Sequence, residues 1–290
     1  MDKISVDAYA KINLTLDVLR RRPDGYHELE MIMQTIDLFD TVDVEKNGTC
    51  QNRVFSDSSK VPEGETNTAY IAAEAMAEKF ALKEGVDIRI KKRIPVAAGL
   101  AGGSADAAAV IKAMRSIFVP HIPAERFVSM ASSIGKDVPF CLKGGTAFAF
   151  GLGDKLAYIK DCPMFFVVLA KPDIDVSTAS VYRALKLDEV TERPDTQAML
   201  KAIVQSDMNK VAGGIKNVLE SVTAKQYPVI RDIKAALLEN GAMASAMSGS
   251  GPSVYGLFDN RDFADKAAEA VKRKFGIKEV FSTQTVNPQS

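Results

Sequence analysis

Residues 95–114 read PVAAGLAGGSADAAAVIKAM. Three glycines, Gly99, Gly102 and Gly103, fall within five residues and are flanked by alanines, so the backbone can turn freely there and approach a ligand closely. Ser104 is expected to cap a helix, because apolar residues then recur at the spacing of one helix face. The stretch therefore predicts a glycine-rich loop that leads into a helix N-terminus.

The residues before this loop extend the pattern. Residues 86–91 alternate apolar and polar side chains, which predicts a half-buried strand. A helix N-terminus carries unpaired N–H groups and the positive end of the helix dipole, which together suit a phosphate. Strand, glycine loop and helix thus indicate nucleotide binding, although neither the Walker A motif nor G-x-G-x-x-G is present. The alternative is an alanine-rich packing helix with a flexible entry loop.

Length and composition limit the possible classes of protein. A chain of 290 residues suggests two domains, with a boundary expected near Tyr158. Lysine and arginine total 37, as do aspartate and glutamate, so no strong field attracts nucleic acid or an anionic membrane. The first ten residues lack an apolar signal core, and the apolar run at 165–170 is too short to span a bilayer. We expect a soluble, cytoplasmic protein.

Metal and disulfide chemistry are not indicated by the sequence. The chain has three widely spaced cysteines and two histidines, which suits neither a disulfide framework nor a histidine-rich transition-metal centre. No metal-ligating residue is therefore assigned. Any metal is expected to be Mg²⁺ carried by phosphates.

The N-terminal residues 4–18 alternate strictly between apolar and polar, which predicts a long or bent strand with its even-numbered residues facing inward. The same period places Lys11 and Asn13 side by side on the polar face. They could present a cation and an amide from a rigid element, or they could belong to an ordinary solvated face.

Two further places carry candidate chemistry. After a turn at Pro23-Asp24-Gly25, Tyr26 and His27 could stack on and hydrogen-bond a heterocyclic base, or simply pack. Asp137 follows Gly135-Lys136 and could be a catalytic group, although such a residue is more often a cap or a turn residue.

The remaining chain alternates helical and strand patterns. Asn67 or Thr66 could cap a helix, and residues 248–252, SGSGP, form a second small-residue loop that could be only a hairpin connection. Helices are expected at 124–134, 178–185, 196–205, 229–238 and 263–275, and strands at 165–170, 242–247, 254–258 and 279–286.

Six blocks, in order along nearly the whole chain, resemble the GHMP family of small-molecule kinases. They are AKINLTLDV, RRPDGYHELE, PVAAGLAGGSADAAA, KDVPFC, VSTASVYRAL and MSGSGPSVYGLF. The resemblance implies an α/β (α+β) two-domain kinase, with an N-terminal ATP-binding domain at 1–158 and a C-terminal substrate-side domain at 159–290. It also implies an active site in the cleft between these domains.

The resemblance further implies roles for individual residues. Lys11 and Asp137 would be the catalytic pair for phosphoryl transfer from ATP with Mg²⁺, a reaction that needs mainly positioning and charge neutralisation. The ATP-phosphate loop would consist of Pro95, Val96, Ala97, Ala98, Gly99, Leu100, Ala101, Gly102, Gly103, Ser104 and Ala105.

The family member that the blocks resemble phosphorylates a cytidine diphosphate alcohol in isoprenoid precursor synthesis. Tyr26 and Tyr182 would then sandwich the cytosine, with His27 at its edge, Thr178 nearby and Asn13 near the reacting alcohol. The family usually has phenylalanine at the position of Tyr182.

The glycine loop departs from the family pattern at two positions. Ala101 replaces a glycine and Ala105 replaces a serine, which puts in doubt any phosphate contact from the second hydroxyl. Another GHMP kinase, of the mevalonate or homoserine type, and a nucleotide-binding regulator without turnover are the alternatives. We expect small-molecule partners only, and a monomer or weak homodimer.

Overall fold

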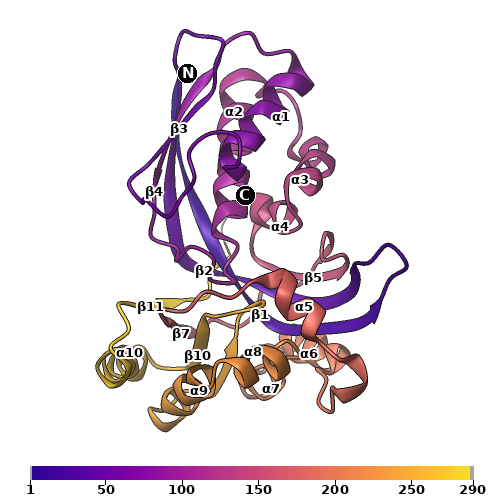
Figure 1. Cartoon of the computed structure of the whole chain (residues 1–290), viewed down its shortest axis with the longest axis vertical. Coiled ribbons are helices and arrows are strands. Elements are labelled where there is room, and N and C mark those ends of the chain that lie inside the picture. Colours follow the sequence, from indigo (N-terminus) through magenta and orange to yellow (C-terminus); the bar gives the residue numbers. More distant parts are fainter. Residues whose placement is uncertain (1, 288–290) are drawn as a thin grey trace. The chain divides into compact units, whose positions relative to one another are not determined.

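The computed structural model describes residues 2–287, whose helices and strands are labelled in Figure 1. The chain forms two compact units, each made of discontinuous segments. Within the described residues, the first unit comprises 2–10, 38–96 and 101–144, and the second comprises 11–37, 97–100 and 145–287. The units are discontinuous because β1 (Lys3–Arg21) and β2 (His27–Lys46) are long enough to run through both.

In the first unit, the strands follow the order β3, β4, β2, β1. The short β3 (Arg53–Ser56) pairs parallel with β4 (Val86–Lys91), and β4 pairs antiparallel with the last six residues of β2. Alternate residues of these strands, including Val42, Val44, Ile88 and Ile90, are buried. The strands therefore present one continuous apolar face, as their period-two pattern predicts.

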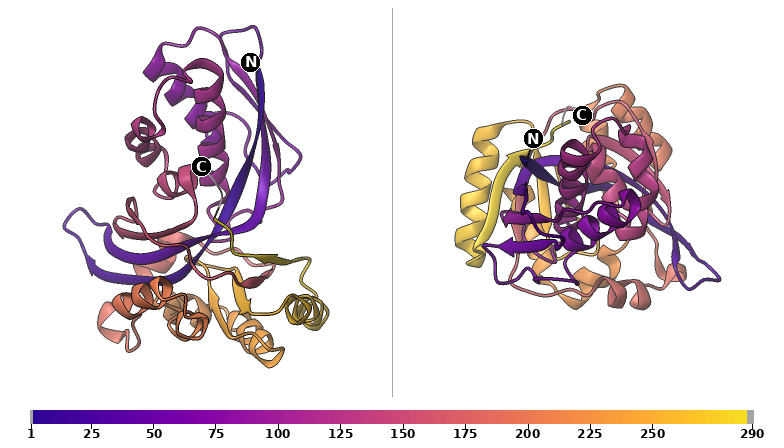
Figure 2. Two further views of the ribbon diagram at one scale, coloured as in Figure 1. Left: turned by 180° about the vertical axis from the view of Figure 1, so that it is seen from behind. Right: turned by 90° about the horizontal axis from the view of Figure 1, so that it is seen from above.

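Helices cover one face of these strands (Figures 1 and 2). They are α1 (Thr68–Phe80), α2 (Gly102–Phe118), α3 (Val128–Ile134) and α4 (Val138–Lys143), with a 3₁₀ turn at Ala124–Phe127. α1 packs directly on α2, whose alanines allow a close approach. Asn67 caps α1 by accepting a hydrogen bond from the N–H of Ala69, which confirms one of the two expected caps.

The second unit contains an antiparallel four-stranded sheet in the order β11, β7, β10, β9. Its strands are β7 (Phe166–Lys171), β9 (Ala244–Met247), β10 (Val254–Phe258) and β11 (Glu279–Gln284). β5 (Thr146–Gly151) pairs with the first part of β2 and with β6 (Lys155–Tyr158), and β8 (Lys216–Asn217) pairs parallel with β1.

The helices of the second unit are α5 (Thr178–Ala184), α6 (Thr196–Val204), α7 (Met208–Gly213), α8 (Glu220–Gln226), α9 (Val229–Glu239) and α10 (Arg261–Phe275). A 3₁₀ turn, Leu187–Glu189, follows α5. α9 and α10 contact each other and the four-stranded sheet. α10 buries Ala264, Ala267, Ala268 and Val271, which lie on one face at helical spacing.

The predicted strands at 86–91, 165–170 and 254–258 are confirmed, as are the helices of the second half. The pattern did not predict α4, α7 and α8, which are six or seven residues long. None of the helices within residues 2–287 has the length and apolarity needed to cross a membrane.

Candidate active site

Lys11 and Asn13 lie on the same face of β1 in the second unit, two residues apart. Lys11 Nζ donates to Asn13 Oδ1 at 2.8 Å and to the backbone oxygen of Gly99 at 3.2 Å. Their exposed fractions are 4% and 1%, so the interpretation of this face as ordinarily solvated is wrong. A buried ammonium needs hydrogen-bond acceptors, and these two acceptors also set its direction.

Asn13 is itself held by three other elements of the second unit. Its Oδ1 accepts a hydrogen bond of 3.0 Å from the N–H of Gly249, and its Nδ2 lies 3.2 Å from Met31 Sδ. The buried hydroxyl of Tyr255 donates to the Asn13 backbone oxygen at 2.7 Å. Rotation of the Asn13 amide would break contacts on both of its ends, so the orientation of Lys11 is fixed indirectly as well.

The small-residue loop at 248–252 connects β9 to β10, which confirms the predicted hairpin connection. It does more than connect strands, because Ser248 Oγ donates to the Gly99 backbone oxygen at 2.9 Å. Asn217 Nδ2 donates to the backbone oxygens of Met247 and Gly249 at 2.8 and 2.7 Å. Sequence reasoning missed Asn217, since no motif surrounds it and β8 has only two residues.

Within the second unit, the glycine-loop segment Ala97–Leu100 needs glycine at one position in particular. Gly99 has a φ of 75°, and a Cβ built on it would lie 2.2 Å from the backbone oxygen of Ser248. Neither the left-handed backbone nor that close approach tolerates a side chain. Ala97 also has a positive φ, 52°, so this segment carries backbone strain next to Lys11.

In the first unit, the loop ends at the N-terminus of α2. Ala101 occupies the N-cap position with φ 61° and makes no side-chain cap, at the position where the family usually has glycine. The first intrahelical bond runs from the Ala105 N–H to the Ala101 oxygen at 2.8 Å. The expectation that Ser104 caps the helix is wrong, because α2 begins at Gly102 and places Ser104 in its first turn. The first N–H groups of such a helix have no intrahelical acceptor, which fits a phosphate.

Asp137, also in the first unit, occupies the N-cap position of α4 without forming a side-chain cap. The local turn is closed by backbone bonds instead, from the Val138 N–H to the Gly135 oxygen and from the Cys141 N–H to the Asp137 oxygen, both 3.1 Å. Capping therefore does not account for an aspartate at this position. A Cβ built on Gly135 would lie 3.6 Å from Ser104 Oγ, so the turn before Asp137 adjoins the first turn of α2.

The residues expected to bind a base lie in the second unit. The rings of His27 and Tyr182 stack with centroids 5.2 Å apart. Thr178 and Tyr182 are four residues apart on α5 and share a helix face, and Thr178 Oγ1 lies 2.8 Å from Ser250 Oγ. Tyr26 is 63% exposed. The structure thus brings His27 and Tyr182 together and leaves Tyr26 with a large solvent-exposed ring.

Burial and the nearby charge of Arg21 lower the pKa of His27. His27 is therefore neutral at neutral pH, and a neutral imidazole offers one donor and one acceptor.

Comparisons with known proteins identify the family of this chain. The model of the GHMP kinases N terminal domain matches residues 67–145, and that of the GHMP kinases C terminal matches residues 199–278. A 4-diphosphocytidyl-2-C-methyl-D-erythritol kinase of Acetivibrio thermocellus is 50% identical over 286 residues, which cover 99% of this chain and 100% of that protein. The chain belongs to the GHMP kinase family.

This GHMP kinase has the two-domain, mixed α/β fold of its family and is an ATP-dependent small-molecule kinase. The crystal structure of 4-(cytidine 5'-diphospho)-2C-methyl-D-erythritol kinase matches with a TM-score of 0.83 at 31% identity, over 98% of this chain and 100% of that one. The homoserine kinase of Cytophaga hutchinsonii matches with a TM-score of 0.78 at 19% identity, over 100% of this chain and 96% of that one. The second likeness supports the fold alone.

Proposed function

We propose that this GHMP kinase transfers the γ-phosphoryl group of ATP to the 2-hydroxyl of 4-diphosphocytidyl-2-C-methyl-D-erythritol, in the non-mevalonate pathway to isoprenoid precursors. The observation that carries the proposal is the 50% identity to a kinase of that name over essentially the full length of both chains. The buried Lys11–Asn13 pair and the stacked His27 and Tyr182 support it.

In the proposed reaction, the 2-hydroxyl oxygen attacks the γ-phosphorus and the bond from that phosphorus to the β,γ-bridging oxygen breaks, so that ADP leaves. The proton of the hydroxyl passes to the Asp137 carboxylate. Lys11, held by Asn13 and Gly99, stabilises the charge that develops on the alcohol oxygen. The transition state is loose, so positioning and charge stabilisation supply most of the rate.

The phosphates of ATP are proposed to lie along residues 95–105, where the N-terminus of α2 supplies N–H donors. Magnesium, bound to those phosphates, would neutralise their charge. Residues 2–287 contain no group of three or more histidine, cysteine or carboxylate side chains that could hold a metal ion by themselves.

The cytosine is proposed to stack between Tyr26 and Tyr182, with neutral His27 hydrogen-bonding its edge and Thr178 close to it. Tyr26 is 63% exposed, so its ring is accessible to a base, which supports this role. Asn13 would hold the alcohol near Lys11. Homoserine and mevalonate have no base to stack, so they would make no use of these residues.

A coupled assay of ADP release tests the proposal on a panel of alcohols that includes the cytidine diphosphate substrate, homoserine and mevalonate. The cytidine diphosphate alcohol should be turned over with a kcat/KM at least about 100-fold above the others, as expected when a site built around polar and stacking contacts meets a substrate lacking them. Preference for homoserine or mevalonate would replace the proposed substrate. No ADP release with any alcohol would favour a regulator.

The proposal also includes the partners, the location and the oligomeric state of the enzyme. It binds small molecules and neither nucleic acid nor membranes. It acts in the cytoplasm, as a monomer or a weak homodimer. ATP binding is assigned to a domain at 1–158 and the substrate side to a domain at 159–290. The balanced charge of the chain, 37 basic and 37 acidic residues, is consistent with these partners.

A further inference from the structure

Three charged side chains of the first unit form a buried cluster beside the glycine loop. Lys92 Nζ donates to Asp40 Oδ2 at 2.5 Å and to Asp106 Oδ2 at 2.9 Å. The exposed fractions of the three side chains are 7%, 0% and 4%. Charges buried to this degree are retained only when they are paired and hydrogen-bonded, and here Lys92 pairs with both carboxylates.

The elements that the cluster joins are the two ends of the glycine loop. Lys92 lies three residues before Pro95, and Asp106 follows Ala105 directly. Asp40, on β2, accepts the N–H groups of Arg93 and Ile94 on Oδ1, at 2.6 and 2.9 Å.

The cluster also reaches the first residue of α2. A Cβ built on Gly102 would lie 3.4 Å from Lys92 Nζ and 3.1 Å from a methyl group of Ile94. The chain that enters the loop and the helix that leaves it are therefore connected through one ammonium group.

The charges of the cluster do not balance. Two carboxylates face one ammonium, and Asp106 Oδ1 is buried without any hydrogen-bond partner. Burial and the neighbouring Asp40 carboxylate raise the pKa of Asp106 to about 7, against the opposing effect of Lys92. Burial alone would lower the pKa of Lys92, but Asp106 and Asp40 outweigh it and raise that pKa.

We propose that Lys92, Asp40 and Asp106 form a positioning cluster that holds the two ends of the glycine loop in the geometry required for ATP. The inference rests on the proposed function insofar as it assigns ATP to this loop. None of the three residues needs to touch the nucleotide. Their effect passes through the backbone of Arg93 and Ile94 on one side and the first turns of α2 on the other.

Substitution of Asp40 by asparagine tests the cluster. Every oxygen of Asp40 accepts from a donor, so either orientation of the amide would set its NH₂ group against Lys92 Nζ or against the Arg93 and Ile94 N–H groups. Asp40→Asn should therefore raise the ATP KM roughly 10- to 100-fold. The KM of the alcohol substrate should stay within about threefold. Hydrogen exchange of residues 93–105 should become faster in the nucleotide-free protein.

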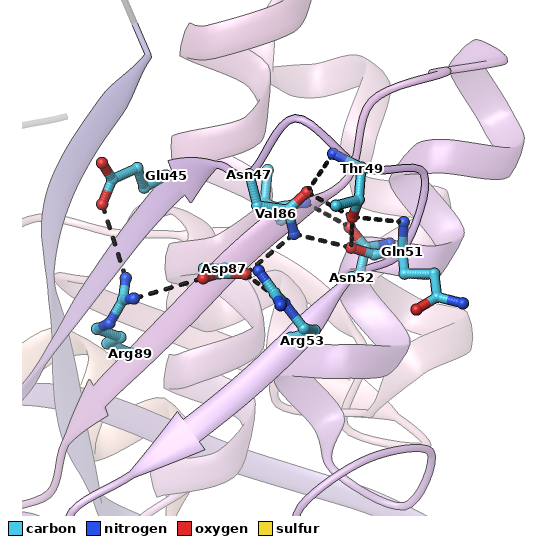
Figure 3. A network of polar contacts seen from close by, with 9 residues as sticks. All are labelled: Glu45, Asn47, Thr49, Gln51, Asn52, Arg53, Val86, Asp87 and Arg89. Carbon is cyan, nitrogen blue, oxygen red and sulfur yellow. Dashed lines mark hydrogen bonds and ion pairs between the residues drawn. The ribbon is translucent and has the colours of Figure 1, made fainter.

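Asp87→Asn is the matched control. Asp87 is also buried in the first unit and accepts hydrogen bonds from Asn47 and Arg53 within the network drawn in Figure 3. It is separated from Lys92 by five residues, about 16 Å of strand. Asp87→Asn should destabilise the protein but keep the ATP KM within about twofold and leave exchange of residues 93–105 unchanged. Equal ATP KM values for Asp40→Asn and Asp87→Asn would overturn the proposal.

A second pair of variants decides the matter if Asp40→Asn does not fold. Asp106→Ala removes the carboxylate on α2 that accepts a hydrogen bond from Lys92. Alanine has the highest helix propensity, so α2 itself should not be weakened. The ATP KM should rise roughly tenfold. Asp106→Asn restores an oxygen acceptor for Lys92 and should bring the ATP KM back to within about threefold of the parent value. If Asp106→Ala binds ATP as the parent does, the cluster does not position the loop.

These outcomes are separable from failure of the proposed function. If the parent protein releases no ADP with the cytidine diphosphate alcohol, the proposed function fails. The exchange rates of residues 93–105 in Asp40→Asn and Asp87→Asn still test the cluster, because that comparison needs neither ATP nor turnover.

Discussion

Lys11 donates a hydrogen bond of 2.8 Å to Asn13, and the same Asn13 oxygen accepts the N–H of Gly249 at 3.0 Å. The period of a β-strand places residues 11 and 13 on one face, but it does not bury them. Burial comes from the loop at 248–252, more than 230 residues further along the chain, which also donates to the backbone of Gly99 through Ser248. The orientation of the Lys11 ammonium is thus a property of several segments together.

The catalytic assignment predicts that Lys11 and Asp137 act together on the same proton transfer and the same developing charge. Asp137→Asn keeps the shape of the side chain and removes its basicity, so kcat should fall roughly 10²- to 10⁴-fold, about 3 to 5.5 kcal/mol of transition-state stabilisation. Lys11→Met should cost at least as much, and the double variant should lose less than the sum of the two. The measurement is kcat at saturating substrates with a thermal melting curve. Retention of more than about a tenth of the parent kcat in Asp137→Asn would remove its role as base.

The glycine loop predicts a specific intolerance at Gly99. Gly99→Ala would force a Cβ to 2.2 Å from the Ser248 oxygen, and the resulting shift should displace Lys11 and lower kcat at least about tenfold. Gly276→Ala is the control, because Gly276 also has a positive φ, 66°, with nothing within 4 Å of its Cβ position. It should cost about 1 to 2 kcal/mol in unfolding free energy and leave the kinetics unchanged. Similar kinetics for both variants would show that the contact with Ser248 is unimportant.

The proposed base site predicts that Tyr26→Ala weakens binding of the alcohol substrate. Stacking of a base on an aromatic side chain is worth about 1 to 3 kcal/mol, so the KM of that substrate should rise roughly 5- to 150-fold. Because Tyr26 is 63% exposed, its removal should cost little unfolding free energy. The ATP KM serves as the internal control and should not change. An unaltered KM for the alcohol would exclude Tyr26 from the base site.

The pKa of Asp106 predicts a pH dependence of stability. Its folded-state pKa, about 7, lies above its ordinary value of 3.8, so between these values the folded protein binds more protons than the unfolded chain. The contribution of Asp106 to the free energy of unfolding therefore decreases as the pH rises from 3.8 to about 7. Asp106→Asn removes the titration and should be more stable than the parent at pH 8 by roughly 1 to 3 kcal/mol, with a smaller difference at pH 5.

Denaturant unfolding at the two pH values measures this difference, with Asp87→Asn as a variant that should destabilise the protein at both. A constant difference between Asp106→Asn and the parent at pH 5 and pH 8 would mean that Asp106 is already ionised throughout this range.

Local patterns in the sequence were enough to predict the longer elements and the family. Strict alternation over residues 4–18, the glycines at 99, 102 and 103 and the helical spacing after them depend on local sterics and on the period of side chains, which a linear sequence contains. The order of six blocks was enough to indicate a GHMP kinase before any geometry was known.

Only the tertiary structure decided which polar residues are buried and what they contact. Lys11 and Asn13 have the pattern of a solvated face, and Asn217 lies in no motif. Lys92 resembles one of several surface lysines. The side chains of all four residues are nevertheless buried by segments distant in sequence. A buried charge is stable only where the fold supplies its partners. Those partners, Asp40 and Asp106 for Lys92 and the Gly99 oxygen for Lys11, come together through long-range packing that no local pattern encodes.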